Sequence, residues 1–173
     1  MEAKALWALV GVVLGSVLSF AGMLATNRIN RCTERRDVAR LLVSEVRFND
    51  SRAIAFANVH ERLSSGQELK DVQGNPIPLD RFLEAELLPG SFSFSTFDAT
   101  LMRQAYFDRE LMEPLQEFYR LLRQAEQFRE AATSHDAPQL RAGFLKDVFE
   151  SAAEAVKVAQ EKNLAGRLEE TSR

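Results

Sequence analysis

The first pattern along the chain is an uncharged, apolar segment near its start. No charged residue occurs from Ala5 to Thr26, a stretch that contains ALVGVVLGSVLSFAGMLAT. A helix of this length, at ~1.5 Å per residue, spans ~33 Å and matches the ~30 Å hydrocarbon core of a bilayer. The pattern predicts a transmembrane anchor over residues 1–27. A cleaved signal peptide and a buried soluble helix are the alternatives.

Beyond the anchor, apolar residues continue at helical spacing. Neither proline nor glycine occurs from Asn27 to Leu63. The apolar residues of this stretch include Val38, Leu41, Leu42, Val46, Ala53, Phe56, Ala57 and Leu63. Intervals of three and four residues place most of them on one helical face. We therefore predict one long helix that continues out of the membrane.

The second half of the chain alternates turn signals with amphipathic segments. Glycine, asparagine and proline within 74–78 predict a turn and a small hairpin near residues 69–79. A short helix is expected over 80–88, and another with Ser95 or Thr96 as its N-cap. Longer amphipathic helices are expected over 109–132 and from about 136 to 163.

These elements predict a mainly α fold, a helical bundle attached to a single anchor. The expected organisation is an anchor over 1–27, a soluble helical domain over 28–165 and a polar tail over 166–173. The first helix of the domain is expected to be continuous with the anchor.

Charge is unevenly distributed around the anchor. Five arginines follow it: Arg28, Arg31, Arg35, Arg36 and Arg40. With Glu34 and Asp37 they give residues 28–40 a net charge of +3, whereas Lys4 is the only basic side chain before the apolar run. Arginine near a membrane end is retained on the cytoplasmic side. We expect an inner-membrane protein with its N-terminus outside and its C-terminal domain in the cytoplasm, and its arginines are suited to bind anionic lipid headgroups.

Small residues form a stripe along the predicted anchor. They recur at intervals of three or four residues at Ala8, Gly11, Gly15, Ser19, Gly22 and Thr26. Small side chains let two helix backbones approach closely in lipid and gain dispersion contacts. The stripe predicts packing against a helix of a membrane protein partner or of a second copy. The alternative is that Gly and Ala are simply frequent in membrane helices.

A polar pair lies on the face of the predicted long helix that carries its apolar residues. Glu45 and Asn49 are four residues apart and in line with Leu42, Val46 and Ala53. A carboxylate and an amide one turn apart can bond to each other or satisfy backbone groups of a neighbouring element. We interpret the pair as structural, because no second carboxylate or histidine shares its spacing.

Residue patterns typical of catalysis, metal binding and cofactor binding are absent from the sequence. The two histidines, His60 and His135, lie far apart, and Cys32 has arginines rather than an activating base around it. No phosphate-binding loop, dinucleotide glycine pattern or nucleophile elbow occurs. After Arg40 the chain is acidic, which argues against nucleic-acid binding. We expect no enzyme activity, metal or cofactor.

Three short motifs resemble a group of uncharacterised bacterial single-pass membrane proteins. The first is L-x-x-E-x-x-x-N, matched by Leu42, Glu45 and Asn49. The others are matched by Ser95, Thr96, Phe97 and Asp98, and by Phe118 and Tyr119. The resemblance implies an N-terminal span with a cytoplasmic helical domain. It implies no activity.

Two functions fit these features. The first is a non-catalytic interaction protein, an accessory or scaffolding subunit of a larger membrane complex. The second is a single-pass signalling protein, in which the continuous helix couples anchor packing to the cytoplasmic bundle.

The predicted orientation can be tested with a reporter fused after Arg173. Because arginines are retained on the cytoplasmic side, a reporter that works only in the cytoplasm should be active. Activity of a reporter that works only in the periplasm, with the cytoplasmic reporter silent, would show the opposite orientation.

Overall fold

The computed structural model describes residues 2–66, 68, 70, 75–76, 92–101, 107–134 and 138–173. Within these ranges, the side chains of residues 2–15, 17, 101, 138 and 139 lie outside the description. Five helices account for most of the described chain, which confirms the mainly α fold class.

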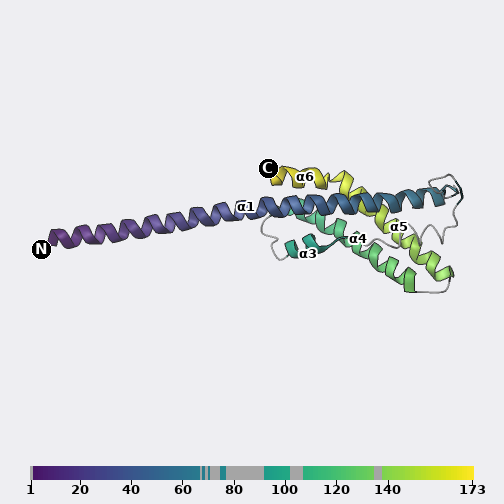
Figure 1. The fold of residues 1–173 in the computed structure, drawn as a ribbon, viewed down its shortest axis with the longest axis horizontal. Helices are drawn as coiled ribbons and strands as arrows, with labels where there is room; N and C mark the ends of the chain where they lie inside the picture. Colours follow the sequence, from purple (N-terminus) through teal and green to yellow (C-terminus); the bar gives the residue numbers. More distant parts are fainter. Residues whose placement is uncertain are drawn as a thin grey trace.

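The longest element is α1 (Glu2–Ser64), a single helix of 63 residues. It carries no proline and no residue with positive φ, so nothing interrupts its backbone. Its N-terminal part projects away from the other helices, and its C-terminal part lies among them (Figure 1). Among the α1 residues whose side chains are described, the first buried one is Ala39, and burial then continues at helical spacing to Val59. The predicted boundary between residues 27 and 28 therefore falls inside an unbroken helix.

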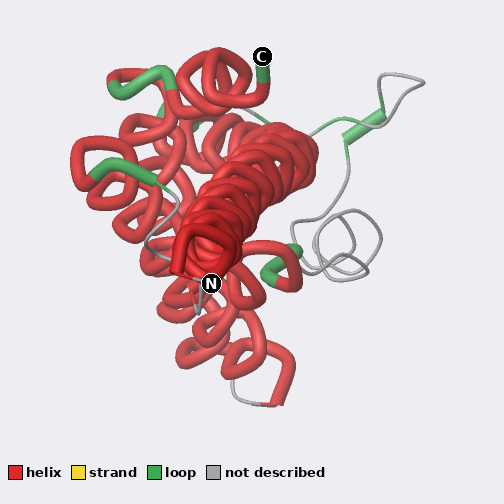
Figure 2. The backbone as a smooth tube through the Cα atoms, turned by 90° about the vertical axis from the view of Figure 1, so that its left-hand side faces the viewer, coloured by secondary structure: helices red, strands yellow, loops and turns green. Residues whose placement is uncertain are grey.

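The bundle consists of the second half of α1, α4 (Arg109–Ser134), α5 (Pro138–Glu161) and α6 (Leu164–Ser172), with the short α3 (Ser95–Leu101) beside them. Figure 2, which looks along α1 from its N-terminal end, shows the other helices gathered mainly on one side of it. The largest fully buried side chains include Tyr119, Phe118, Leu115 and Leu122 of α4 and Leu42 of α1. Pro114 lies in the second turn of α4 and has no N–H to donate to the Glu110 carbonyl, which accepts a hydrogen bond from the Arg167 guanidinium instead.

The α4 and α5 helices agree closely with the sequence prediction, because their apolar residues follow a helical period throughout. The region of the predicted hairpin contains one antiparallel bridge, Lys70 with Pro76, and no strand is found among the described residues. The remaining residues of 69–79 and the short helix expected over 80–88 lie outside the described residues.

The predicted polar tail over 166–173 is wrong. All of these residues except Arg173 belong to α6, which runs back along α1 (Figure 1). Leu164 and Leu168 are four residues apart and fully buried, so a single apolar stripe is enough to dock this otherwise polar helix. Arg47 of α1 forms an ion pair with Glu169, and the Arg167 guanidinium donates to the Glu110 carbonyl at 3.0 Å.

One residue with a left-handed backbone conformation lets the chain turn from α5 into α6. Asn163 has φ 46° and ψ 50°, and its amide donates to the Gln160 carbonyl at 3.1 Å. Asparagine tolerates this conformation better than most residues other than glycine. The chain leaves α5 at this point and begins α6 in a new direction.

Replacing Leu168 by alanine should destabilise the bundle, because it removes a fully buried side chain. The expected loss is about 2–4 kcal/mol in the free energy of unfolding. Leu140→Ala is the matched control, since Leu140 is 54% exposed on α5 and should change stability by less than about 0.5 kcal/mol. Thermal or chemical unfolding of the detergent-purified protein measures both variants. Equal stability of the two variants would contradict the docking of α6.

Candidate functional site

Glu45 and Asn49 lie on the face of α1 that enters the bundle. Glu45 is 6% exposed and Asn49 is fully buried. Both side chains bond to residues 93–97, which include the start of α3, and Glu45 also bonds to α4. We call these two residues, with the groups that they bind, the α1 clamp.

The carboxylate of Glu45 accepts bonds from two backbone amides of the first turn of α3. The Thr96 amide donates to Oε2 at 2.8 Å, and the Phe97 amide donates to Oε1 at 3.0 Å. A helix leaves its first amides without partners, and a negative charge at that end is favourable. Glu45 thus caps α3 from another helix, instead of the Ser95 or Thr96 side chain expected from the sequence.

Three hydroxyl groups complete the environment of Glu45. The Tyr119 hydroxyl donates to Oε1 at 2.8 Å, and the Ser93 and Ser95 hydroxyls donate to Oε2 at 3.1 and 3.3 Å. The carboxylate therefore receives five hydrogen bonds from three parts of the chain. Such saturation compensates the cost of placing a charge in the interior.

Asn49 pairs with the backbone of Ser93. The Ser93 amide donates to Oδ1 of Asn49 at 2.8 Å, and Nδ2 of Asn49 donates to the Ser93 carbonyl at 2.7 Å. The side-chain amide thereby satisfies both backbone groups of one residue, as a neighbouring strand would. This contact holds the chain in place just before α3 begins.

Tyr119 connects the clamp to the aromatic part of the core. Its ring stacks on Phe97 with centroids 3.9 Å apart and an interplanar angle of 5°, and it meets Phe118 edge-on at 5.3 Å. Burial and the neighbouring Glu45 carboxylate raise the pKa of Tyr119 well above its ordinary value. The hydroxyl therefore stays protonated and remains a donor to Glu45.

The pKa of Glu45 reflects two opposing effects. Burial raises the pKa, but hydrogen bonds from the Thr96 and Phe97 amides and the Tyr119 hydroxyl together outweigh it. The net pKa lies below the ordinary glutamate value, so the group is a carboxylate at neutral pH. Both oxygens are occupied by donors, which suits a group that binds and positions chain segments rather than one that takes a proton from a substrate.

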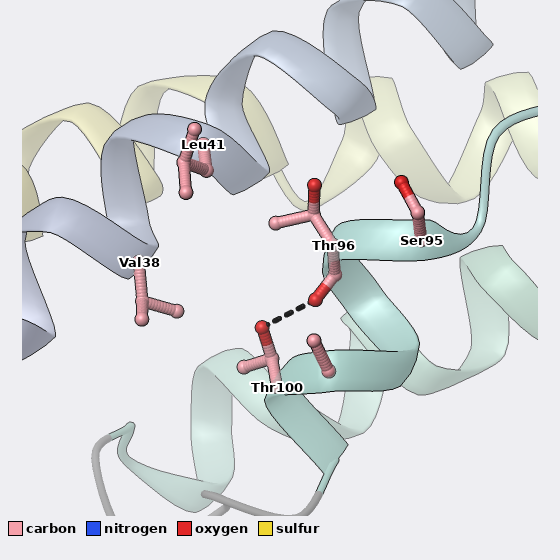
Figure 3. A pocket seen from close by; sticks show the side chains of 6 residues that line it. Val38, Leu41, Ser95, Thr96 and Thr100 are labelled. Atoms are coloured by element: carbon pink, nitrogen blue, oxygen red, sulfur yellow. Dashed lines mark hydrogen bonds between the residues drawn. The ribbon is translucent and has the colours of Figure 1, made fainter.

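A surface groove runs beside the clamp between α1 and α3. One hollow of about 380 Å³ is lined by Val38 and Leu41 of α1 and by Ser95, Thr96, Ala99 and Thr100 of α3 (Figure 3). A second, of about 360 Å³, shares Leu41, Ser95 and Thr96 and reaches Phe48. Thr100 turns its hydroxyl to the Thr96 carbonyl at 2.6 Å. The groove therefore presents mainly methyl groups and hydroxyls that are already bonded.

The structure brings together residues from all three sequence motifs. Glu45 and Asn49 come from the first motif, Thr96 and Phe97 from the second and Tyr119 from the third. Sequence reasoning proposed that the Glu45–Asn49 pair could satisfy a neighbouring element, but it did not identify Ser93, Thr96, Phe97 and Tyr119 as the partners. The alternation of serine and phenylalanine over 91–94 and the isolated E-F-Y on α4 were the only signals available.

The arginines after the predicted anchor lie away from the clamp on the surface of α1. Arg28, Arg31, Arg36 and Arg40 are exposed, and Arg35 is partly covered. Two make ion pairs: Arg35 with Asp108 at 3.7 Å and Arg40 with Asp37 at 3.9 Å. Such exposed pairs contribute little to stability.

The small-residue stripe is described only in part. Ser19 and Gly22 are exposed, and a methyl group added at Gly22 would meet nothing within 4 Å. Ala8, Gly11 and Gly15 lie on α1, but their side-chain surroundings fall outside the description. In the part of the chain whose side chains are described, no helix combines the length and apolarity needed to cross a membrane.

Among the described residues, no group of three or more His, Cys, Asp or Glu side chains could hold a metal ion. Cys32 is an exposed free thiol on α1. Comparisons with protein-family models, with curated proteins and with solved structures found no match to this chain.

The depressed pKa of Glu45 predicts a specific pH dependence of stability. Glu45 stabilises the folded protein above its unfolded pKa of about 4.3, and this contribution is lost as pH falls through the lower folded pKa. Glu45→Gln should therefore cost on the order of 3 kcal/mol at pH 7 and progressively less as pH falls below about 4. Thermal unfolding of both proteins between pH 3 and pH 7 measures the difference.

The control for this experiment is Glu161→Gln, because Glu161 is exposed at the end of α5. It should shift the melting temperature little at any pH. A stability difference between wild type and Glu45→Gln that stays constant down to pH 3 would show that Glu45 has no depressed pKa.

Proposed function

We propose that this protein is a membrane-anchored, non-catalytic interaction protein, an accessory or scaffolding subunit of a larger membrane complex. The observation that carries the proposal is the projecting part of α1. Beyond the bundle this helix exposes several large apolar side chains: Leu18, Phe20, Met23, Leu24 and Ile29 are 54–71% exposed. Contiguous exposed apolar surface of this kind marks a contact with lipid or with another protein.

The sequence supports lipid as the first environment of this region. The apolar run from Ala5 to Thr26 has the length of a bilayer crossing, and the five arginines follow it directly. In this proposal the N-terminus lies outside the inner membrane and the bundle lies in the cytoplasm. Ser19 and Gly22 then belong to the face that packs against a helix of the partner, and the arginines contact headgroups.

The saturated state of Glu45 supports the non-catalytic part of the proposal. Its two oxygens bind donors of α3, the preceding segment and α4. Glu45 and Tyr119, whose pKa values depart from their ordinary values, thus join segments of the chain to one another.

Signalling is a second candidate function, and a different observation favours it. The unbroken α1 helix connects the projecting region directly to the clamp. A change in the packing of the anchor would therefore reach α3 and α4 without passing a hinge.

The decisive experiment is gentle detergent purification of the C-terminally tagged protein from its native membranes, with the mass and composition of the particle determined. We expect a stoichiometric complex with other membrane proteins. Gly15→Ile should reduce recovery of the partner by about tenfold, because a bulky side chain on the small-residue face separates the helix backbones. Val13→Ile is the matched control, since Val13 lies on the opposite side of the helix and should leave recovery unchanged.

A monomer without partners in mild detergent would contradict the accessory-subunit proposal. A homo-oligomer sensitive to Gly15→Ile would favour the signalling candidate instead.

A further inference from the structure

The attachment of α3 differs between its two neighbours. Phe97 stacks on Tyr119 of α4, and Asp98 forms an ion pair with Arg123 of α4. The Arg123 guanidinium also lies 5.1 Å from the centre of the Phe94 ring. On the side of α1, surface hollows lie beside Leu41, and Glu45 and Asn49 bind residues 93–97 through hydrogen bonds. The α3 helix therefore contacts α4 through side chains, whereas the backbone at its start is bound to α1 by Glu45 and Asn49.

We propose that Glu45 and Asn49 form a register lock, which holds α1 at one axial position against α3 and α4, so that displacement of α1 by one helical turn releases α3 from α1. This inference rests on the proposed function, because a membrane-anchored α1 is the element that a partner would displace.

The two halves of the clamp are chemically different, and that difference defines the register. The Glu45 position faces five donors, whereas the Asn49 position faces one donor and one acceptor of Ser93. An ionised carboxylate only accepts, while an amide both donates and accepts. Each side chain therefore fits its own position and not that of the other.

A slide of one turn in either direction breaks every bond of the clamp. If Asn49 moves to the Glu45 position, its NH₂ group faces donors, and Ala53 leaves both backbone groups of Ser93 without partners. If the slide is the other way, Leu41 meets the five donors and the carboxylate of Glu45 meets the Ser93 carbonyl. Both slides are unfavourable, because they leave buried polar groups without partners or place two hydrogen-bond donors or two acceptors face to face.

Apolar packing favours the same register. A slide of one turn exchanges similar side chains at Leu42 and Val46, but it places Arg52 or His60 at the position of the buried Phe56. A polar side chain buried there without a partner is unfavourable, so the apolar face adds to the effect of the clamp. Because α1 contains no proline or positive-φ residue, an axial movement at its N-terminal part is transmitted to residues 45–49. One-turn displacements of packed helices are a known form of switching.

Three backbone amides report directly on this lock. The amides of Ser93, Thr96 and Phe97 donate to side-chain oxygens of α1. Opening of the clamp therefore exposes them to solvent while α4 stays folded. Native-state hydrogen exchange measures this opening in the unmodified, full-length protein in detergent micelles.

We expect the three amides to exchange together, at a rate at least tenfold above that of the buried α4 amides around Leu115 and Leu122. Glu45→Gln should accelerate the three amides by about tenfold or more relative to those α4 amides. Glu161→Gln, on the exposed end of α5, is the control and should change neither group.

A distance measurement tests the slide itself. One spin label is attached to the native Cys32 and the other to Gln127→Cys, at an exposed position of α4. The wild-type background should give one distance population, and Glu45→Gln a second population shifted by up to about 5.4 Å, the pitch of one helical turn.

The proposal would be overturned if the three amides of the wild-type protein exchanged only through global unfolding, at the rate of the α4 amides. This test does not require Glu45→Gln to fold. A single unshifted distance population in a folded Glu45→Gln protein would also overturn it. Neither result depends on whether a partner is recovered from membranes, so failure of the lock and failure of the proposed function are distinguishable.

Discussion

The bundle depends on one buried carboxylate. Glu45 lies on a long apolar helix face, where a charge is costly unless its hydrogen-bonding capacity is filled. Five donors from the segment before α3, from α3 itself and from Tyr119 fill it. Three segments distant in sequence must meet at one point for this to happen. The position of α3 and the orientation of the Tyr119 ring both follow from that requirement.

Much of the helical architecture could be predicted from periodicity. The spacing of apolar residues located α4 and α5 to within a few residues, and the absence of proline predicted an unbroken α1. These features are local, because each depends on residues within a few turns. Whether the segment before Asn27 crosses a membrane stays a prediction.

The missed features have two physical causes. The sequence predicts a polar tail in place of α6 because Leu164 and Leu168 are its buried residues, and two leucines within a polar stretch give a weak signal. The partners of Glu45 were missed because they lie 48 to 74 residues away in the sequence. Helical spacing indicates which face is buried, but it does not indicate what covers that face. A polar residue on an apolar face remains the best signal that a specific partner exists.

The placement of α6 also affects the order in which the protein can fold during synthesis. Leu164 follows Ser64, the last residue of α1, by 100 residues, yet α6 lies along α1 near Arg47. Contacts between such distant segments cannot form until both have left the ribosome. The α1 surface that α6 covers therefore stays open while α4 and α5 emerge, and chaperones or a membrane partner can reach it during that interval.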